Sequence, residues 1–246
     1  MNHFRRDAPL SVVSPANFYS VDDLAIISDI KTYIADPTFP CVGAKAALAQ
    51  GNVNFRIYDS IADASATTSL HFDLMEYVQT IDLNGPQIQS FAAIFKHSVD
   101  GGEEAFETRL WTQLSMLYEQ SKGLQIDWNK EVSPDPDSPH FSMSIAGHPF
   151  FVVGMHGQAS REARRTPYPT LVFNSNLQFD RLRADGRYDK LKAIIRQREI
   201  KFNGSVNPML DDHGRTSEAR QYSGRNLPAD WVCPFHAKAD AGKISK

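Results

Sequence analysis

The sequence has little of what marks a secreted, membrane-spanning or nucleic-acid-binding protein. Only two of its 246 residues are cysteines, Cys41 and Cys233. A disulfide between these two distant cysteines is one alternative, but two free thiols in a reducing compartment are favoured. No apolar run approaches the ~20 residues of a membrane span, and the N-terminus lacks the apolar core of a signal peptide. A net charge of -3 argues against nucleic acid as the main partner. We therefore expect a cytoplasmic protein with no membrane or nucleic-acid partner.

Recognised cofactor motifs are also missing. There is no glycine-rich dinucleotide fingerprint, no phosphate-binding loop, no His-Glu-x-x-His and no Cys-x-x-Cys, and the eight histidines are scattered. Any metal or cofactor would have to be held by residues from separate parts of the chain.

Hydrophobic periodicity predicts alternating helices and strands without a regular βαβα order. The expected helices cover residues 21–35, 41–50, 66–79, 103–121 and 179–198. The expected strands cover residues 53–61, 90–97, 141–145, 149–156 and 170–174. This order favours an α+β fold, with a mixed, mainly antiparallel sheet flanked by helices. We expect residues 1–19 to be a loosely ordered lead-in and residues 20–240 to form a single domain. The sequence leaves open whether the chain forms a homodimer.

The segment 148–236 concentrates residues that suit chemistry. Eleven arginines lie between Arg161 and Arg225, and a guanidinium binds carboxylate or phosphate through two parallel hydrogen bonds. Arg161, Arg164 and Arg165 follow an apolar strand and a small-residue turn, a common place for a site. The arginines of 179–198 fit a solvated basic helix face at least as well.

His156, Cys233 and Cys41 are the candidate ligands for a metal. His156 projects from the turn after the strand, although a single histidine is more often a structural hydrogen-bonding group. Cys233 precedes a proline, and a buried inert thiol beside Trp231 is its simpler interpretation. Cys41 begins a predicted helix, where the helix dipole lowers a thiol pKa and favours the thiolate.

Several strings in the chain resemble conserved motifs of the YqcI/YcgG family. They are Phe39-Pro-Cys-Val-Gly-Ala44, His148-Pro-Phe-Phe-Val-Val-Gly-Met-His156, Ala159-Ser-Arg-Glu-Ala-Arg-Arg165, Leu171-Val-Phe-Asn174, Asn207-Pro-Met-Leu210, Ser217-Glu-Ala-Arg-Gln-Tyr-Ser-Gly-Arg225 and Trp231-Val-Cys-Pro-Phe235. The resemblance runs from about residue 20 to residue 236. Its longest string, Ser217 to Arg225, is unlikely to arise by chance.

The resemblance implies haem b, dioxygen and an external electron donor, because characterised relatives include haem-dependent N-hydroxylases of arginine-like guanidino amino acids. It favours His156 as the axial ligand, with Cys233 or Cys41 as thiolate alternatives. The other residues that we assign to cofactor binding are Arg161, Arg164, Arg165, Phe151, Phe173, Trp231 and Cys233. Phe150 is a further candidate for the porphyrin wall. The alternative function is a haem-binding sensor or carrier without turnover, and a third is a haem-free binding module for small anions.

A free amino acid needs a clamp for its carboxylate and an acid for its cationic side chain. Glu218, with Asp211 as an alternative, is the candidate acid, although Glu218 equally fits an internal pair with an arginine. Asn174 joins His156 and Glu218 in the predicted catalytic set. The predicted substrate-binding residues are Asn207, Arg220, Tyr222 and Arg225.

Overall fold

Five strands form one mixed sheet in the order β1-β2-β5-β4-β3. The chain is described here by a computed structural model, which covers residues 19–205, 209 and 214–237. The strands are β1 (Val53–Tyr58), β2 (Ser90–Phe95), β3 (Met143–Ile145), β4 (His148–Met155) and β5 (Thr170–Ser175). β1 and β2 run parallel, whereas β2–β5, β5–β4 and β4–β3 are antiparallel pairs. The predicted α+β class and mainly antiparallel sheet are therefore confirmed.

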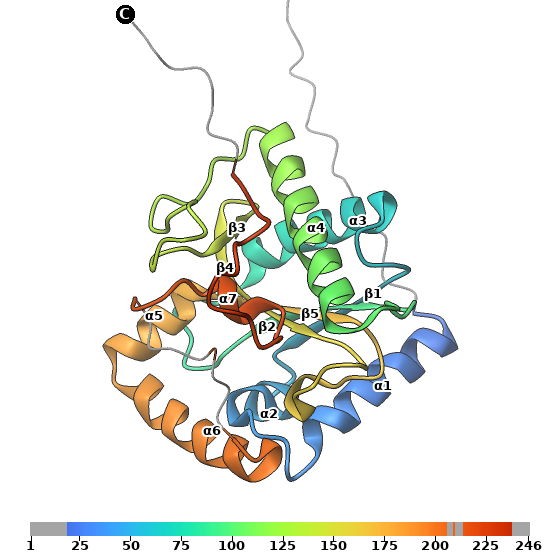
Figure 1. Ribbon diagram of the computed structural model, residues 1–246, viewed down its shortest axis with the longest axis vertical. Coiled ribbons are helices and arrows are strands. Elements are labelled where there is room, and N and C mark those ends of the chain that lie inside the picture. The colour runs from blue at the N-terminus through green and yellow to red at the C-terminus, as the bar shows by residue number, and fades with distance from the viewer. Residues whose placement is uncertain (1–18, 206–208, 210–213, 238–246) are drawn as a thin grey trace, which may run out of the picture.

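Helices cover both faces of this sheet (Figure 1). The helices are α1 (Val21–Ala35), α2 (Val42–Ala49), α3 (Ala64–Thr80) and α4 (Gly102–Gly123). On one face, Phe91 and Phe95 of β2 enter the core cluster that α3 and α4 complete. On the other face, Ala92 and Ile94 pack with α1 and the partly buried side of α2. Because successive side chains of a strand point to opposite faces, the uninterrupted apolar run of β2 is what a strand covered on both sides requires.

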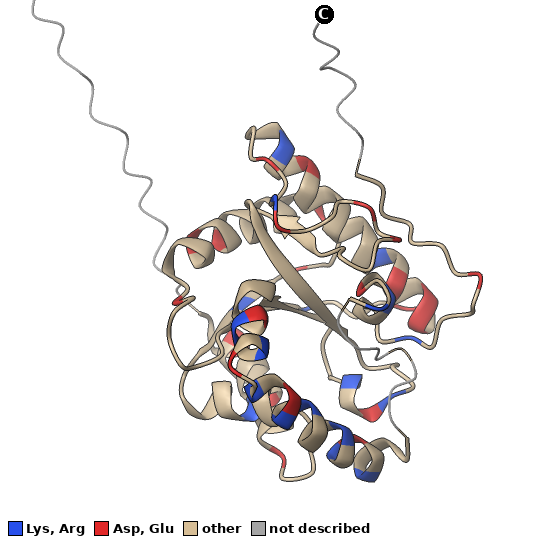
Figure 2. Ribbon diagram, turned by 90° about the vertical axis from the view of Figure 1, so that its left-hand side faces the viewer, with Lys and Arg blue, Asp and Glu red and all other residues tan. Residues whose placement is uncertain are grey.

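One predicted helix is wrong in its extent. Residues 179–198 were expected to form a single helix, but the structure has α5 (Asn176–Ala184) and α6 (Arg187–Asn203). Gly186 lies between them with a φ of 73°, a left-handed conformation that ends one helix and lets the chain turn. Basic residues recur along α5 and α6, as Figure 2 shows.

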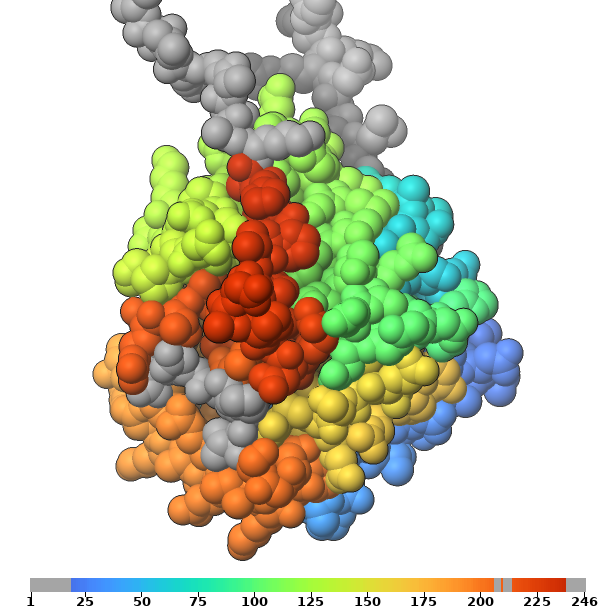
Figure 3. Space-filling view, viewed as in Figure 1, coloured from blue at the N-terminus to red at the C-terminus, as the bar shows by residue number. Residues whose placement is uncertain are grey.

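The C-terminal segment crosses the molecule as a strap with little regular structure. It contains α7 (Ala219–Tyr222), and a short 3-10 helix, η1 (Glu162–Arg164), follows β4 earlier in the chain. Figure 3 shows the later part of this segment lying between α4 and the loop that precedes β3. Phe235, near its end, is fully buried among core aromatic rings. The segment is therefore part of the domain core.

Candidate functional site

The outer edge of β4 is where the C-terminal segment meets the sheet. β3 pairs with β4 only at His148–Phe150, so the rest of this edge needs other partners. The Tyr222 hydroxyl accepts the N–H of Met143 at 3.1 Å and lies 3.0 Å from the carbonyl oxygen of Phe150. Arg164 Nη1 donates to the carbonyl oxygen of Gly154 at 2.8 Å. Side chains of α7 and η1 thus take the place of a neighbouring strand.

Glu218 places a buried carboxyl group beside this edge. The residue is 8% exposed, and burial raises the pKa of its carboxyl to about 7, although hydrogen bonds from Tyr222 and Asn176 oppose the rise. Glu218 Oε1 lies 2.5 Å from the Tyr222 hydroxyl. That hydroxyl has one proton and a second acceptor, the carbonyl of Phe150. When the tyrosine donates to Phe150, the Glu218 contact needs a proton on the carboxyl, in agreement with its raised pKa.

Asn176 belongs to the same polar cluster, and His148 bonds to Ser175, the residue before Asn176. Asn176 Nδ2 lies 3.0 Å from Glu218 Oε2 and also donates to Ser142 Oγ at 2.5 Å, whereas its Oδ1 is buried with no hydrogen-bond partner among the described residues. The His148 Nε2 lies 2.8 Å from Ser175 Oγ. Burial lowers the pKa of His148 to about 4, so its imidazole is neutral at pH 7. The cluster therefore combines an amide with a carboxyl that titrates near neutrality, and the neutral imidazole of His148 is bonded to the adjacent Ser175.

The three arginines after β4 have different surroundings. Arg164 donates to backbone carbonyls of Gly154 and Gln221, and burial lowers its pKa to about 10. Gly224 lies against it with a φ of 80°, and a Cβ there would approach Arg164 Cγ to 3.1 Å. Arg161 forms an ion pair with Glu199 at 2.6 Å. Arg165 donates to the carbonyls of Ala159 and Ser160. Arg164 is thus committed to the backbone, whereas Arg161 and Arg165 reach the surface.

Arg161 and Arg165 line a hollow of about 400 Å³. Its other walls come from the loop after β4, the end of α6 and the C-terminal segment: Ser160, Glu162, Phe202, Asn203, Ser205 and Asn226. Two buried polar atoms near it, Glu199 Oε2 and Asn203 Nδ2, have no hydrogen-bond partner among the described residues. Guanidinium and amide donors around one hollow suit a carboxylate or phosphate group.

Cys41 is the N-cap residue of α2, in agreement with the prediction that a helix begins at this residue. Its Sγ accepts the N–H of Ala44 at 3.4 Å. The thiol is free, and it lies close enough to Arg164 and Glu199 for their charges to affect it. Burial nevertheless raises the pKa of this thiol in the metal-free protein. The expectation of a lowered pKa at this helix start is therefore wrong. Desolvation of the thiolate outweighs the favourable N–H contact.

His156 and Cys233 lie on the α4 side of the sheet. The His156 ring is 3% exposed and stacks on Phe106 with centroids 4.3 Å apart, and burial lowers its pKa. Cys233 is a free thiol in the core cluster that includes Trp111 and Phe235, and burial raises its pKa to about 12. Neither residue lines the hollow beside Arg161 and Arg165. In the part of the chain that the structure describes, no group of three or more His, Cys, Asp or Glu residues could hold a metal ion.

Three predicted substrate-binding residues hold the C-terminal segment in place. Tyr222 anchors α7 at the edge of β4, as described above. Arg225 donates to Glu107 Oε2 of α4 through two nitrogens, at 2.6 and 2.8 Å. Arg220 donates to the carbonyl of Pro228 at 2.7 Å and lies over the Trp231 ring. Their side chains therefore have partners inside the protein.

The remaining predicted residues are spread over the sheet. Phe173 and Phe150 are fully buried with their rings in contact, and Phe151 is partly buried against Phe179. Asn174 accepts a hydrogen bond from Ser90 and links β2 to β5. Asn207 and Asp211 lie outside the described residues. The roles assigned to all these residues stay predictions.

Two residues of the site were given no role from the sequence. Glu199 lies just beyond the helix boundary that was predicted at 198, and nothing local distinguishes it from other acids of a charged helix. Asn176 directly follows the apolar strand β5, and its polarity at the end of a buried strand was the available signal. Only the fold brings each one to its partner, Arg161 or Glu218.

The fold and these clusters define a single α+β domain with buried ionisable groups around the edge of β4 and a cationic hollow beside it. The YqcI/YcgG family matches residues 30–236, which is most of the chain, so the protein belongs to this family. No curated protein and no solved structure matches the chain. Among the residues that the structure describes, no helix is long and apolar enough to cross a membrane.

Proposed function

We propose that this protein is a cytoplasmic haem-dependent monooxygenase that N-hydroxylates a free arginine-like guanidino amino acid. In that reaction one oxygen atom of O₂ forms the new N–O bond, the other leaves as water, and an external donor supplies two electrons. Membership of the YqcI/YcgG family supports the proposal. The single structural observation that carries it is the placing of a helix-capping thiol, Cys41, close to Arg164 and to Glu199, the ion-pair partner of Arg161.

Residues of this region offer the two kinds of group that haem requires, a ligand atom and cations. Haem needs an axial ligand and cations for two propionates. Cys41 offers a sulfur that already accepts an N–H at the start of α2, a contact that stabilises a thiolate. Arg161, in the wall of the hollow, would pair with a propionate, which leaves Arg165 for the substrate. Bound haem would supply the activation of O₂ for oxygen transfer to nitrogen.

We favour Cys41 as the ligand over His156, which the family resemblance favours, although neither residue lines the hollow. The His156 ring is stacked on Phe106 in the core, and Cys233 is enclosed by aromatic rings. Because metal ligands bind as thiolates, iron binding would release the proton that Cys41 otherwise keeps. Haem loading through Cys41 is therefore expected to increase with pH.

The substrate fits the same hollow through its carboxylate. A cavity of about 400 Å³ is within the usual range for small-molecule sites. Arg165 has no acidic partner among the described residues, so it can pair with a carboxylate without breaking an ion pair. The amides of Asn203 and Asn226 line the hollow beside it. In this proposal these groups orient the amino acid and leave its guanidine free to react.

A serine at position 41 tests the ligand. Serine is a good helix cap, so Cys41→Ser keeps α2 while removing the sulfur. We expect the wild-type protein from haem-supplemented cells to show a Soret band with a thiolate-type ferrous-CO spectrum, and Cys41→Ser to lose both. Cys233→Ala and His156→Gln are the matched controls and should keep the band. A colourless wild-type protein that takes up no added haemin would refute the proposal.

Turnover separates the enzyme from a haem sensor or carrier. The wild-type protein is incubated with arginine and related guanidino amino acids, a reductant and O₂, and products are examined for one added oxygen by mass spectrometry. Red protein without any oxygenated product would make it a carrier. Arg165→Gln should raise the substrate concentration needed for half-maximal rate more than it changes the maximal rate.

A further inference from the structure

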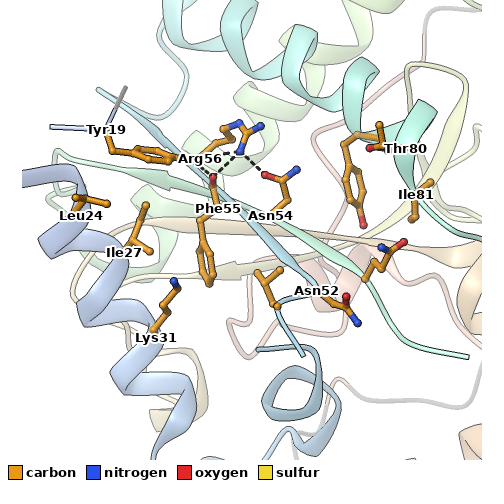
Figure 4. Close-up of a pocket in the computed structure, with 14 residues that line it drawn as sticks. Tyr19, Leu24, Ile27, Lys31, Asn52, Asn54, Phe55, Arg56, Thr80 and Ile81 are labelled. Carbon is orange, nitrogen blue, oxygen red and sulfur yellow. Dashed lines mark hydrogen bonds between the residues drawn. The ribbon is translucent and has the colours of Figure 1, made fainter. Parts of the chain in front are cut away.

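A groove runs along the free edge of β1, far from the cluster at β4. β1 is the outermost strand of the sheet, and its partner β2 lies on one side only. A hollow of about 440 Å³ follows this edge, which we call the β1 groove. Figure 4 shows its walls: Leu24, Ile27 and Lys31 project from α1 on one side, and Thr80 and Ile81 lie at the end of α3 on the other.

Backbone groups on the floor of the β1 groove point outward. The carbonyls of Asn52 and Tyr58 accept N–H groups from the β2 side, at Ser90 and Lys96. Because the backbone N–H and carbonyl groups of successive residues in a strand point to opposite sides, those of Val53 and Phe55 point away from β2. The carbonyl of Phe55 accepts the Tyr19 hydroxyl at 2.7 Å, which confirms this direction. For the N–H groups of Val53 and Phe55 the described residues provide no partner, so they are donors for an added strand.

A buried hydroxyl also lines the groove without a partner. Tyr77 of α3 is 4% exposed, and its hydroxyl oxygen has no hydrogen-bond partner among the described residues. A buried hydroxyl without a partner costs free energy that a ligand in the groove would recover. It therefore points to an occupant with polar groups.

The charge and shape of the groove define that occupant. Two cations line it, Lys31 and Arg56, and none of its lining residues is acidic, although Arg56 also lies 3.8 Å from the carboxylate of Asp73, so Lys31 carries most of the charge argument. Leu24, 54% exposed, offers apolar surface on the α1 side, whereas Arg56 and Tyr77 lie on the α3 side. An extended chain in this groove would turn alternate side chains toward the two walls. The matching segment carries acidic residues, which can face Lys31 on the α1 wall or Arg56 on the α3 wall, among apolar ones that can face Leu24.

We propose that the β1 groove binds an extended acidic peptide segment of another protein, which adds as a strand to the free edge of β1. A second copy of this chain fits the groove poorly, because edge-to-edge pairing of two β1 strands would bring Lys31 and Arg56 of both copies together. Strand addition supplies main-chain hydrogen bonds for affinity and leaves specificity to the alternating side chains.

Synthetic hexapeptides test this proposal. The probes are blocked at both ends and alternate glutamate with valine, beginning with either residue; lysine–valine peptides are the charge controls. We expect a glutamate peptide to bind with a Kd below about 1 mM at low salt and more weakly at high salt. Binding should slow amide hydrogen exchange at Val53 and Phe55.

Two variants of the groove sharpen the test. Tyr77→Phe removes only the hydroxyl and should weaken binding about threefold to tenfold, the effect of one neutral hydrogen bond, with no loss of thermal stability. Lys31→Glu should weaken it about fivefold. Lys130→Glu makes the same charge change at an exposed position in the loop between α4 and β3 and should leave binding unchanged.

Three results of the peptide experiments would overturn the proposal. They are the failure of both glutamate peptides to bind up to about 1 mM, equal binding of the lysine peptides, and binding that leaves exchange at Val53 and Phe55 unchanged. Dimerisation of the free protein through the β1 edge would also overturn it.

Discussion

Replacing Glu218 with glutamine is expected to change how stability depends on pH. The folded protein holds the pKa of this carboxyl at about 7, against 4.5 for the ordinary group, because burial disfavours its charge. Below pH 4.5 the carboxyl is protonated in both the folded and the unfolded protein, so its titration takes nothing from the free energy of unfolding. Between 4.5 and about 7 only the unfolded chain releases the proton, so the free energy of unfolding falls as pH rises.

The magnitude follows from the same two values. Each pH unit between them corresponds to 1.36 kcal/mol, so wild-type protein loses about 3 kcal/mol from Glu218 by pH 8. Glutamine has no such titration. The substitution itself can change stability by a constant amount at every pH. The difference in free energy of unfolding, Glu218→Gln minus wild type, should nevertheless be about 3 kcal/mol larger at pH 8 than at pH 4.5.

The assay is urea unfolding followed by tryptophan fluorescence at pH 4.5, 6, 7 and 8. Comparing the two proteins removes the contributions of other titrating groups, His148 and His156 included. Glu131→Gln, which removes a carboxyl from an exposed loop position, is the matched control and should parallel the wild type. Parallel curves for Glu218→Gln and the wild type over this range would refute the account of a protonated Glu218.

Two further predictions concern the edge of β4. A Cβ at Gly154 would approach the Tyr222 carbonyl oxygen to 2.8 Å and Leu110 to 2.6 Å, so Gly154→Ala should lower the free energy of unfolding by about 1–3 kcal/mol. Gly123→Ala, where no atom lies within 4 Å, is its control and should have little effect. Arg164→Lys should cost about 2 kcal/mol, because a lysine keeps the charge but not the fork that reaches the carbonyls of Gly154 and Gln221 together. Chemical denaturation measures both; unchanged midpoints in Gly154→Ala or Arg164→Lys would contradict the close packing of α7 and η1 on β4.

The sequence predicted most of the elements because their signals are local. Ser20 and Asp23 cap α1 through two reciprocal hydrogen bonds, the pattern expected at a helix start. The apolar run of β2 indicated a strand buried on both faces. The single helix over 179–198 failed because a glycine inside a basic helical pattern does not reveal its left-handed conformation.

The state of the ionisable groups depends on contacts that no local pattern contains. Sequence located Glu218 in a polar string, but its raised pKa comes from burial against β4 and from Tyr222 and Asn176. Cys41 was expected to have a lowered pKa, and desolvation reverses the sign. Only the tertiary structure shows that Arg164 serves the backbone while Arg161 and Arg165 line a hollow.

The sequence by itself determined the class of fold, the helix and strand positions and the family to which the chain belongs, because periodicity, caps and motif strings are properties of neighbouring residues. The tertiary structure decided which arginines are available to a ligand, which carboxyl stays protonated and which strand edge is open. These properties depend on solvent exclusion and on partners distant in the sequence, and both arise only when the sheet and its helices come together.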